Sequence, residues 1–278
     1  MKSEISQPPD LINRVSVIIP TRNSARTIGR CISSIKEQSY KNIEIFVIDS
    51  FSSDNTTKIA SDLKANVFSL DGERARAKNF GISKARGKFL LFIDSDMALQ
   101  PCVVEECVRI WSVNRRIVSV TIPERSVGSG FWVRVRDFER NLYKGSKVES
   151  PRFFIKEFVT QVGGFDEDIV AYEESTLPQK LEAIGMYVNA RATSLILHDE
   201  EEFSLRKWLD KKRYGGETGK LYSEKYKNYA KMQFGILYRS SIFLANGNWK
   251  ILIRHPILST GVLVLKTLEY LYFFLRNF

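Results

Sequence analysis

The first third of the chain alternates between apolar runs and segments whose apolar residues recur at helical spacing. Bulky apolar residues dominate 14–20, 42–49 and 88–94. Such runs are typical of strands that are buried on both faces of a parallel sheet. The segments between them predict helices over about 24–38, 55–65 and 71–85, with a short strand at 66–70. This alternation predicts an α/β fold with a mostly parallel sheet and right-handed crossovers.

The pattern continues after residue 100 with longer intervals. It predicts a helix over 101–114, a strand over 117–122, a flexible link over 126–130 and a helix over 131–142. A turn over 161–167, a helix ending near 185 and a short strand over 195–197 follow. The helix over 131–142 carries Arg134, Arg136 and Arg140. These residues form either a solvated basic face or a surface that meets a phosphate-bearing acceptor.

Carboxylates follow two of the predicted buried strands. The run over 88–94 ends in Asp94-Ser95-Asp96, and the run over 42–49 ends in Asp49. Ligands of open α/β sheets bind outside the carboxyl ends of the strands. Paired carboxylates at that place suit Mg²⁺ or Mn²⁺ together with substrate phosphates. Asp-x-Asp alone is a weak signal, because Asp166-Glu167-Asp168 also matches and is interpreted as a turn.

Charge is unevenly placed along the 278 residues. Residues 1–202 hold 28 Lys+Arg and 28 Asp+Glu, whereas residues 203–278 hold 14 and 4. A nucleic-acid partner is not expected, because no nucleic-acid motif is present and the basic excess is confined to the tail. A basic, aromatic and apolar tail favours attachment to an anionic membrane surface. The polar amino-terminal segment lacks an apolar signal core, so the cytoplasmic face of the cell membrane is expected.

The tail contains the longest apolar run of the chain. Residues 257–275 are long enough to cross a bilayer, but Lys266 and Glu269 interrupt the run. These two charges fall on the side of the helix opposite most of the large apolar residues, which favours an amphipathic helix in the membrane interface. A spanning helix and a helix buried at a subunit contact remain alternatives. Residues 222–244 are expected to form a second interfacial helix. Residues 1–216 are therefore expected to form a catalytic domain that stays soluble when the tail is cut before Tyr222.

Five motifs occur in the order seen in a known family. They are VSVIIPTRN at 15–23, FVIDSFSSDNT at 46–56, ARAKNFGISKARGKFLLFIDSDM at 75–97, VGGFDE at 162–167 and YEESTLPQKLEAIG at 172–185. Together they resemble the family 2 inverting glycosyltransferases, which have the GT-A fold. Among these, the chain is similar to small archaeal and bacterial membrane-associated enzymes that glycosylate lipid-linked acceptors.

The resemblance implies roles for individual residues. Glu174 inherits the role of general base, with Glu173 as the alternative, and Asp96 that of the Mn²⁺ or Mg²⁺ ligand. Asp49 is implied to contact the nucleotide base, and Asp94 the base and ribose. The whole set of implied nucleotide-sugar contacts is Pro20, Thr21, Asn23, Asp49, Lys78, Asp94, Ser95 and Arg213. The Gln-x-x-Arg-Trp motif of processive members is not present, which implies transfer of a single sugar.

The implied reaction moves mannose or glucose from a GDP- or UDP-linked donor to a polyprenyl or dolichyl phosphate or its glycan. The expected partners are this nucleotide sugar, the lipid-linked acceptor and a membrane surface, and a homo-oligomer is left open. Two alternative functions fit the sequence less well. A nucleotidyltransferase of the same fold needs a Gly-rich basic loop after the first strand, whereas this chain has Thr21-Arg22-Asn23-Ser24. A non-catalytic membrane scaffold would not need the retained carboxylates.

Overall fold

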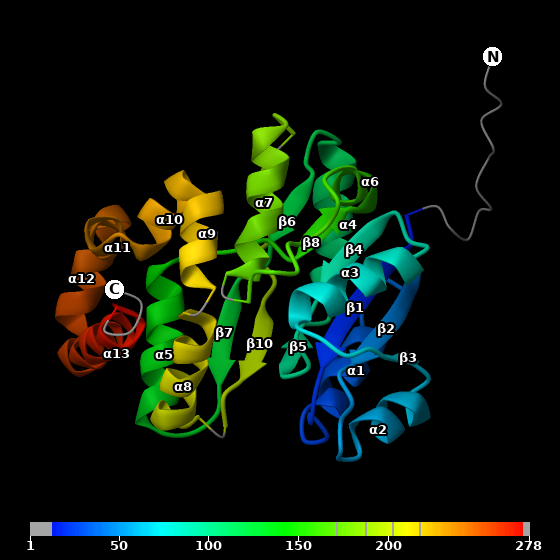
Figure 1. Ribbon diagram of the computed structural model, residues 1–278, viewed down its shortest axis with the longest axis horizontal. Helices are drawn as coiled ribbons and strands as arrows, with labels where there is room; N and C mark the ends of the chain where they lie inside the picture. Colours follow the sequence, from blue (N-terminus) through cyan, green and yellow to red (C-terminus); the bar gives the residue numbers. More distant parts are fainter. Residues whose placement is uncertain (1–12, 171, 187, 202, 217, 275–278) are drawn as a thin grey trace.

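A seven-stranded sheet forms the centre of the molecule (Figure 1). The computed structural model describes residues 13–170, 172–186, 188–201, 203–216 and 218–274. The strand order is β3-β2-β1-β4-β8-β6-β9, and all pairs are parallel except those that β8 makes. The strands are β1 (Val15–Thr21), β2 (Ile43–Asp49), β3 (Asn66–Ser69), β4 (Phe89–Phe92), β6 (Ser119–Thr121), β8 (Phe153–Ile155) and β9 (Asn189–Arg191). The predicted α/β fold is confirmed.

Helices cover both faces of the sheet, which explains the apolar runs. All seven residues of β1 are buried. Val17 and Ile19 pack with α1 (Ile28–Lys36) on one face, and Ile18 packs with α3 (Arg74–Lys84) on the other. A Cβ atom at Gly81 of α3 would lie 2.5 Å from Ile18 Cγ2, so the close approach of this helix depends on glycine. The helix α2 (Thr56–Asp62) connects β2 to β3.

A small second sheet brings distant segments to the end of β4. It consists of β5 (Met97–Leu99), β10 (Ile196–Asp199) and β7 (Glu124–Val127). β10 lies between the other two, and His198 pairs with Met97 on one side and Ser126 on the other. Two sequence predictions are corrected here. The strand predicted over 195–197 and ending in His198 runs from Ile196 to Asp199, and the link predicted over 126–130 begins inside β7 because Ser126 is held in the β10 ladder.

Four further helices complete the first 200 residues. They are α4 (Val103–Val113), α5 (Phe131–Leu142), α6 (Lys156–Gln161) and α7 (Glu173–Ala183). Val135, Phe138 and Leu142 of α5 are buried, as the helical spacing predicted. They pack against the carboxyl-terminal helices and not against the central sheet. This helix therefore joins the catalytic part of the chain to the tail.

The tail forms a cluster of short helices beside α5 and away from β1–β3 (Figure 1). Its helices are α8 (Leu205–Gly216), α9 (Gly219–Lys225), α10 (Lys227–Phe234), α11 (Ile236–Leu244), α12 (Asn248–Arg254) and α13 (Pro256–Phe274). The single helix predicted over 222–244 is instead divided into three, with breaks at Tyr226 and Gly235.

The last helix buries its charges and exposes apolar side chains. Lys266 makes ion pairs with Glu139 of α5 and with Glu269, and Glu269 also pairs with Lys212 of α8 at 2.7 Å. Ile257 is 73% exposed and Leu263 67%. The side of the helix that carries Lys266 and Glu269 therefore packs against α5 and α8, which supply Glu139 and Lys212. The helix extends over 256–274, and residue 275 of the predicted run lies outside the described residues.

Within the described chain, no individual helix combines the length and the apolar character that crossing a membrane requires. The segments Leu237–Arg254 and Pro256–Leu271 meet those criteria only when taken together, and they are bent by 118° relative to one another.

Candidate active site

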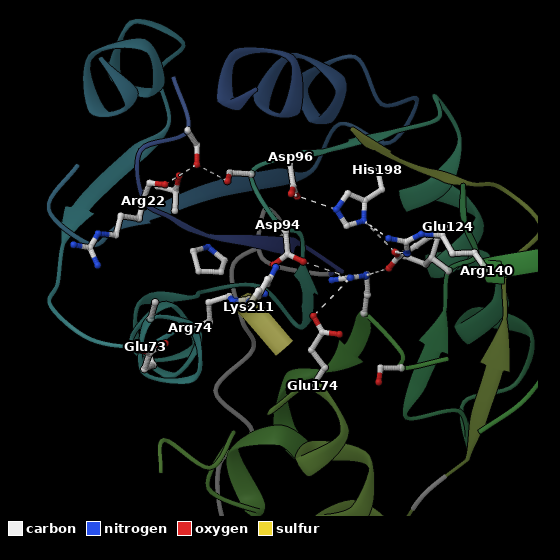
Figure 2. A pocket seen from close by; sticks show the side chains of 18 of the residues that line it. Arg22, Glu73, Arg74, Asp94, Asp96, Glu124, Arg140, Glu174, His198 and Lys211 are labelled. Carbon is white, nitrogen blue, oxygen red and sulfur yellow. Dashed lines mark hydrogen bonds and ion pairs between the residues drawn. The ribbon is translucent and has the colours of Figure 1, made fainter. Parts of the chain in front are cut away.

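The principal cavity opens at the carboxyl ends of β1 and β4 and has a volume of about 690 Å³ (Figure 2). Pro20 and Thr21 line it from the end of β1, and Asp94, Ser95 and Asp96 line it from the loop between β4 and β5. The parallel pairing of β1 with β4 brings these segments together. The structure brings these predicted site residues together, because the ends of neighbouring parallel strands share one edge of the sheet.

The Asp-x-Asp loop presents carboxylate oxygens that lack protein partners. Ser95 Oγ donates a hydrogen bond to Ser24 Oγ at 2.8 Å and fixes the loop. Oδ1 of Asp94 and Oδ1 of Asp96 are buried without a hydrogen-bond partner among the described residues. Burial acts to raise the pKa of Asp94, but Arg152, Lys78 and Arg74 hold it below its usual range. Asp94 is therefore an anion in this cavity.

His198 lies beside Asp96 and extends the acidic site. Its Nε2 is 3.3 Å from Asp96 Oδ2, and its Nδ1 is 3.6 Å from Glu124 Oε2 and 2.6 Å from an Arg140 nitrogen (Figure 2). Burial lowers the pKa of His198, whereas hydrogen bonds to Asp96 and Glu124 raise it to about 9. The two carboxylates that favour a proton on this ring also favour a divalent cation beside it.

These residues fit a divalent cation. Asp96 offers a buried oxygen without a partner among the described residues. His198 Nε2 can serve as a ligand once Arg140, which can only donate, moves away from Nδ1 and Nδ1 carries the proton toward Glu124. One carboxylate and one imidazole suit Mn²⁺ better than Mg²⁺, which prefers oxygen alone. Among the described residues no three Asp, Glu, His or Cys side chains form a complete metal site. Two protein ligands are enough where substrate phosphates complete the coordination.

Arg152 lies at the centre of the acidic groups. Its guanidinium is 2.6 Å from Glu124, 3.5 Å from Asp94 and 3.7 Å from Glu174. The side chain is almost fully buried, which lowers the pKa of Arg152, but the three carboxylates raise it well above its usual value. Arg152 therefore neutralises charge that would otherwise repel within the cavity, and it fixes the relative positions of Asp94 and Glu174.

The acidic pair at the start of α7 faces two directions. Tyr172, which precedes the helix, has a left-handed backbone conformation with φ 65° and starts the helix at Glu173. Glu174 lines the principal cavity, where it faces the Asp94 side (Figure 2). Glu173 is buried, with Lys78 Nζ at 3.5 Å and Arg74 at 3.9 Å. Glu174 is therefore the better placed of the two to meet a substrate.

Three predicted nucleotide contacts lie outside the cavity lining. Asp49 accepts hydrogen bonds from the Ser52 hydroxyl and backbone N–H. Asn23 Oδ1 accepts from the backbone N–H of Ser53 at 2.9 Å. Lys78 is buried and its ammonium lies 3.5 Å from Glu173 and 3.7 Å from Glu174. Asp49 and Asn23 thus shape the loop after β2, and Lys78 holds the acidic pair. Their contact with a nucleotide stays a prediction.

Thr21, unlike Asp49, Asn23 and Lys78, lies where a nucleotide in the cavity could contact it. It lines the cavity beside Pro20, and its Oγ1 is buried without a hydrogen-bond partner among the described residues. A buried hydroxyl of this kind can bond a polar ligand atom without first losing a protein partner. The side chain of Arg213 lies outside the described residues, so its predicted contact with the diphosphate is not tested.

Basic residues form the wall on the side of the tail. Arg136 and Arg140 of α5 and Lys211 and Lys212 of α8 line the principal cavity. Arg136 pairs with Glu139, and Arg140 pairs with Glu124 and Glu200. Repulsion from Arg74, together with burial, lowers the pKa of Lys211. The helix over 131–142 therefore has two of its three named arginines at the site, and Arg134 is exposed.

The second Asp-x-Asp has a structural role. Asp166 pairs with Lys180 at 2.6 Å and Lys225 at 2.8 Å, and it accepts a hydrogen bond from Tyr226. It ties α7 to α9 and does not line the principal cavity.

Sequence reasoning missed Arg152, Glu124 and His198, which come from three different strands or their ends. Only His198, at the end of a predicted strand and one of two histidines, carried a recognisable signal.

Comparison with known proteins identifies the class. The family described as "Glycosyl transferase family 2" matches residues 16–166, which is more than half of the chain, and the chain belongs to this family. The resemblance inferred from the five motifs is therefore confirmed.

Similar curated proteins include "Glycosyltransferase GlyG" of Streptococcus pneumoniae, 34% identical over 98 residues that cover 33% of either chain. The "UDP-Glc:alpha-D-GlcNAc-diphosphoundecaprenol beta-1,3-glucosyltransferase WfgD" of Escherichia coli is 39% identical over 87 residues, or 30% of this chain and 34% of that protein. The chain thus spans about a third of the length of these relatives. The solved mannosyltransferase PcManGT of Pyrobaculum calidifontis, in complex with GDP-Man and Mn²⁺, superposes with a TM-score of 0.64 at 16% identity, covering 95% of this chain and 86% of that one. This likeness shows the GT-A fold.

Proposed function

We propose that the protein is a metal-dependent inverting glycosyltransferase that moves one sugar from a nucleotide sugar to a lipid-linked acceptor. The observation that carries the proposal is the arrangement of one cavity. Asp94 and Asp96 lie on one side, Glu174 lies on the other, and Arg152 is between them. Inversion needs a group that takes a proton from the acceptor while the leaving group is stabilised on the opposite face of the sugar.

The roles of the residues follow from this arrangement. Asp96 and His198 would hold a divalent cation, whose positive charge stabilises the diphosphate leaving group. Pro20, Thr21 and Asp94 would bind the nucleoside part of the donor. Glu174 would accept the proton of an acceptor hydroxyl as that oxygen attacks the sugar. Arg152 and Lys78, which each lie 3.7 Å from the Glu174 carboxylate, would hold it in position.

The acceptor atom is more consistent with a sugar hydroxyl than with a phosphate oxygen. A phosphate oxygen already carries negative charge at neutral pH and needs no general base, whereas a hydroxyl does. Glu174 at the cavity wall therefore favours a glycan that is carried by a lipid diphosphate. The printed name of WfgD describes an acceptor of this chemical kind, which supports the proposal.

For the donor we propose mannose or glucose, linked to GDP or UDP. The relatives and structural neighbours named above include enzymes of both sugars. The test is a panel of radiolabelled nucleotide sugars incubated with the protein, Mn²⁺ and a membrane lipid extract. Radioactivity should enter the organic phase with one donor and disappear when EDTA is added. Release of the sugar into water alone, or nucleotide exchange without sugar transfer, would count against the proposal.

We also propose that the tail holds the protein on the cytoplasmic face of the cell membrane. Leu237 of α11 is 87% exposed, Ile253 of α12 is 70% exposed, and Ile257 at the start of α13 is 73% exposed. Lys250 and Arg254 are exposed on α12. Each basic residue near an anionic surface contributes about 1 kcal/mol, and the apolar side chains would enter the acyl boundary.

This attachment can be measured by flotation with vesicles of phosphatidylglycerol and phosphatidylcholine. Ile253→Glu should weaken binding, because it places a carboxylate in the apolar surface. Val113→Glu is the matched control, since Val113 is 83% exposed at the end of α4, outside the tail. Equal flotation of both variants would show that the tail does not make the contact.

A further inference from the structure

A second, largely apolar groove lies between α10, α11 and α13. It has a volume of about 450 Å³. Its apolar walls come from Phe234, Phe243, Leu252, Val262 and Leu263. Leu263 is largely exposed, so the groove opens on the same surface as the exposed apolar residues of the tail. The proposed reaction does not use this groove.

The groove is continuous with the catalytic cavity. Tyr172, Gln233 and Arg239 line both the groove and a polar cavity of about 500 Å³ beside it. This polar cavity in turn shares Glu174 and Lys211 with the principal cavity. A path lined by described residues therefore leads from the proposed general base to the apolar groove. A ligand with a polar head and an apolar chain matches this order of surfaces.

Arg239 lies at the boundary between the groove and the polar cavity. Arg239 donates a hydrogen bond from Nε to the backbone oxygen of Gln233 at 2.6 Å and one from Nη1 to the Tyr143 hydroxyl at 3.3 Å. Its guanidinium makes no ion pair within 4.0 Å with a carboxylate among the described residues, although Glu269 and Glu139 are near enough to act on its charge. By contrast, Lys266 and Glu269, which also line the groove, pair with each other. A planar guanidinium with donors to spare suits a phosphate or diphosphate.

We propose that this groove binds the first part of the hydrocarbon chain of the lipid-linked acceptor, with the acceptor's diphosphate at Arg239 and its sugar in the catalytic cavity. The inference rests on the proposed function and adds where the lipid lies. Two observations support the proposal. The Arg239 cation lies where the apolar groove joins the polar cavity. A lipid diphosphate needs a cation at its head and an apolar surface along its chain.

Two neighbouring serines of α11 allow a matched test. Ser240 is exposed and lines the groove, whereas the adjacent exposed Ser241 does not. Ser240→Trp should fill the groove, and Ser241→Trp should add the same side chain outside it. The measurement is the ratio of kcat/KM for two acceptors with the same sugar diphosphate, one on a long polyprenyl chain and one on a short alkyl chain. Binding of the nucleotide donor to each full-length variant verifies the fold.

We expect Ser240→Trp to lower this ratio and Ser241→Trp to leave it unchanged. Each methylene kept out of an apolar site weakens binding about fourfold, so excluding two of them should lower the ratio roughly 15-fold. In addition, a polyprenyl diphosphate with a diazirine in its chain should label residues of α11 and α13. Arg239→Gln should raise the KM for both acceptors, since both carry the diphosphate.

Other outcomes separate the inference from the proposed function. If the wild type glycosylates the long-chain acceptor and Ser240→Trp keeps the ratio, the chain lies elsewhere and only the inference is overturned. An equal fall in both tryptophan variants overturns it as well. If Ser240→Trp changes the oligomeric state instead, a second copy of the chain occupies the groove. If the protein binds a nucleotide sugar but glycosylates neither acceptor, the proposed acceptor and the inference fail together.

Discussion

Replacing Lys266 by methionine tests how α13 is held on the catalytic part of the protein. The Lys266 ammonium lies between Glu139 of α5 and Glu269 of its own helix. Both carboxylates are buried, and Glu269 is also paired with Lys212. Methionine has a similar length and no charge. Arg136 also pairs with Glu139, so Lys266→Met removes one cation from a buried network of at least five charges and changes the packing volume little.

The expected loss of stability is large. Removing one partner of a buried ion pair typically costs about 3–5 kcal/mol, because the remaining charge stays buried. The pKa of Glu139 gives a second figure. Burial raises this pKa, but Lys266 and Arg136 lower it to about 2. Compared with the usual glutamate value near 4.3, that shift corresponds to about 3 kcal/mol, to which Lys266 and Arg136 both contribute.

The pH dependence has a definite sign. The folded-state pKa of Glu139 lies below its unfolded value, so this stabilisation is present above about pH 4.3 and is lost as the pH falls toward 2. Urea denaturation of wild type and Lys266→Met at neutral pH should therefore differ by about 3 kcal/mol or more. The difference should narrow as the pH falls below about 4.

Lys147→Met is the matched control. Lys147 pairs with Glu182 at 3.9 Å, but both side chains are about half exposed. Its loss should cost no more than about 1 kcal/mol. If Lys266→Met were no more destabilising than this control, the packing of α13 against α5 would not depend on the buried charges.

The buried charges between α5, α8 and α13 also change the expectation for truncation. Cutting before Tyr222 would leave Glu139 and Lys212 without α13, so the remaining chain should be unstable and not a soluble domain.

Three further predictions concern the catalytic cavity. Glu174→Gln should lower kcat by roughly 10²–10⁴-fold with donor binding near normal, measured by product formation and nucleotide titration; a matching loss only in Glu173→Gln would exchange their roles. Asp96→Ala should abolish Mn²⁺-dependent nucleotide binding in calorimetry, whereas Asp166→Ala should keep it, and the reverse pattern would move the metal site. Arg152→Met should cost about 3–5 kcal/mol in thermal or urea denaturation, because three carboxylates surround this one guanidinium, and a near-neutral effect would show that they are neutralised in another way.

Local pattern was sufficient for five strands of the central sheet and for one edge of the site, whereas β8 and β9 were not predicted. The runs over 14–20, 42–49 and 88–94 become β1, β2 and β4, because an apolar run without polar alternation is stable only when both of its faces are covered. Asp94 and Asp96 then follow β4 by necessity, and the parallel pairing of β1 with β4 brings them to Thr21. The acidic pair Glu173-Glu174 was found through the motif, and the structure places Glu174 at the cavity.

The direction of individual side chains was not available from the sequence. Asn23, Asp49 and Lys78 occupy motif positions, yet their polar atoms bond to neighbouring loops or to the acidic pair. A motif fixes the place of a residue along the chain, whereas its neighbours in space decide which way the side chain points. Arg152 and His198 show the converse, because they reach the cavity only through the pairing of strands far apart in the sequence.

The orientation of the tail illustrates the same limit. The helical wheel separated Lys266 and Glu269 from most of the large apolar residues of the last helix and favoured a helix in the membrane interface. Yet Val262 and Leu265 are buried together with these charges against α5. The structure turns the charged side inward, because Glu139 and Lys212 supply partners on α5 and α8. The sequence alone determined that the helix has two unlike faces. Only the tertiary structure decided which face is buried, because the cost of burying a charge depends on the opposite charges that the fold places beside it.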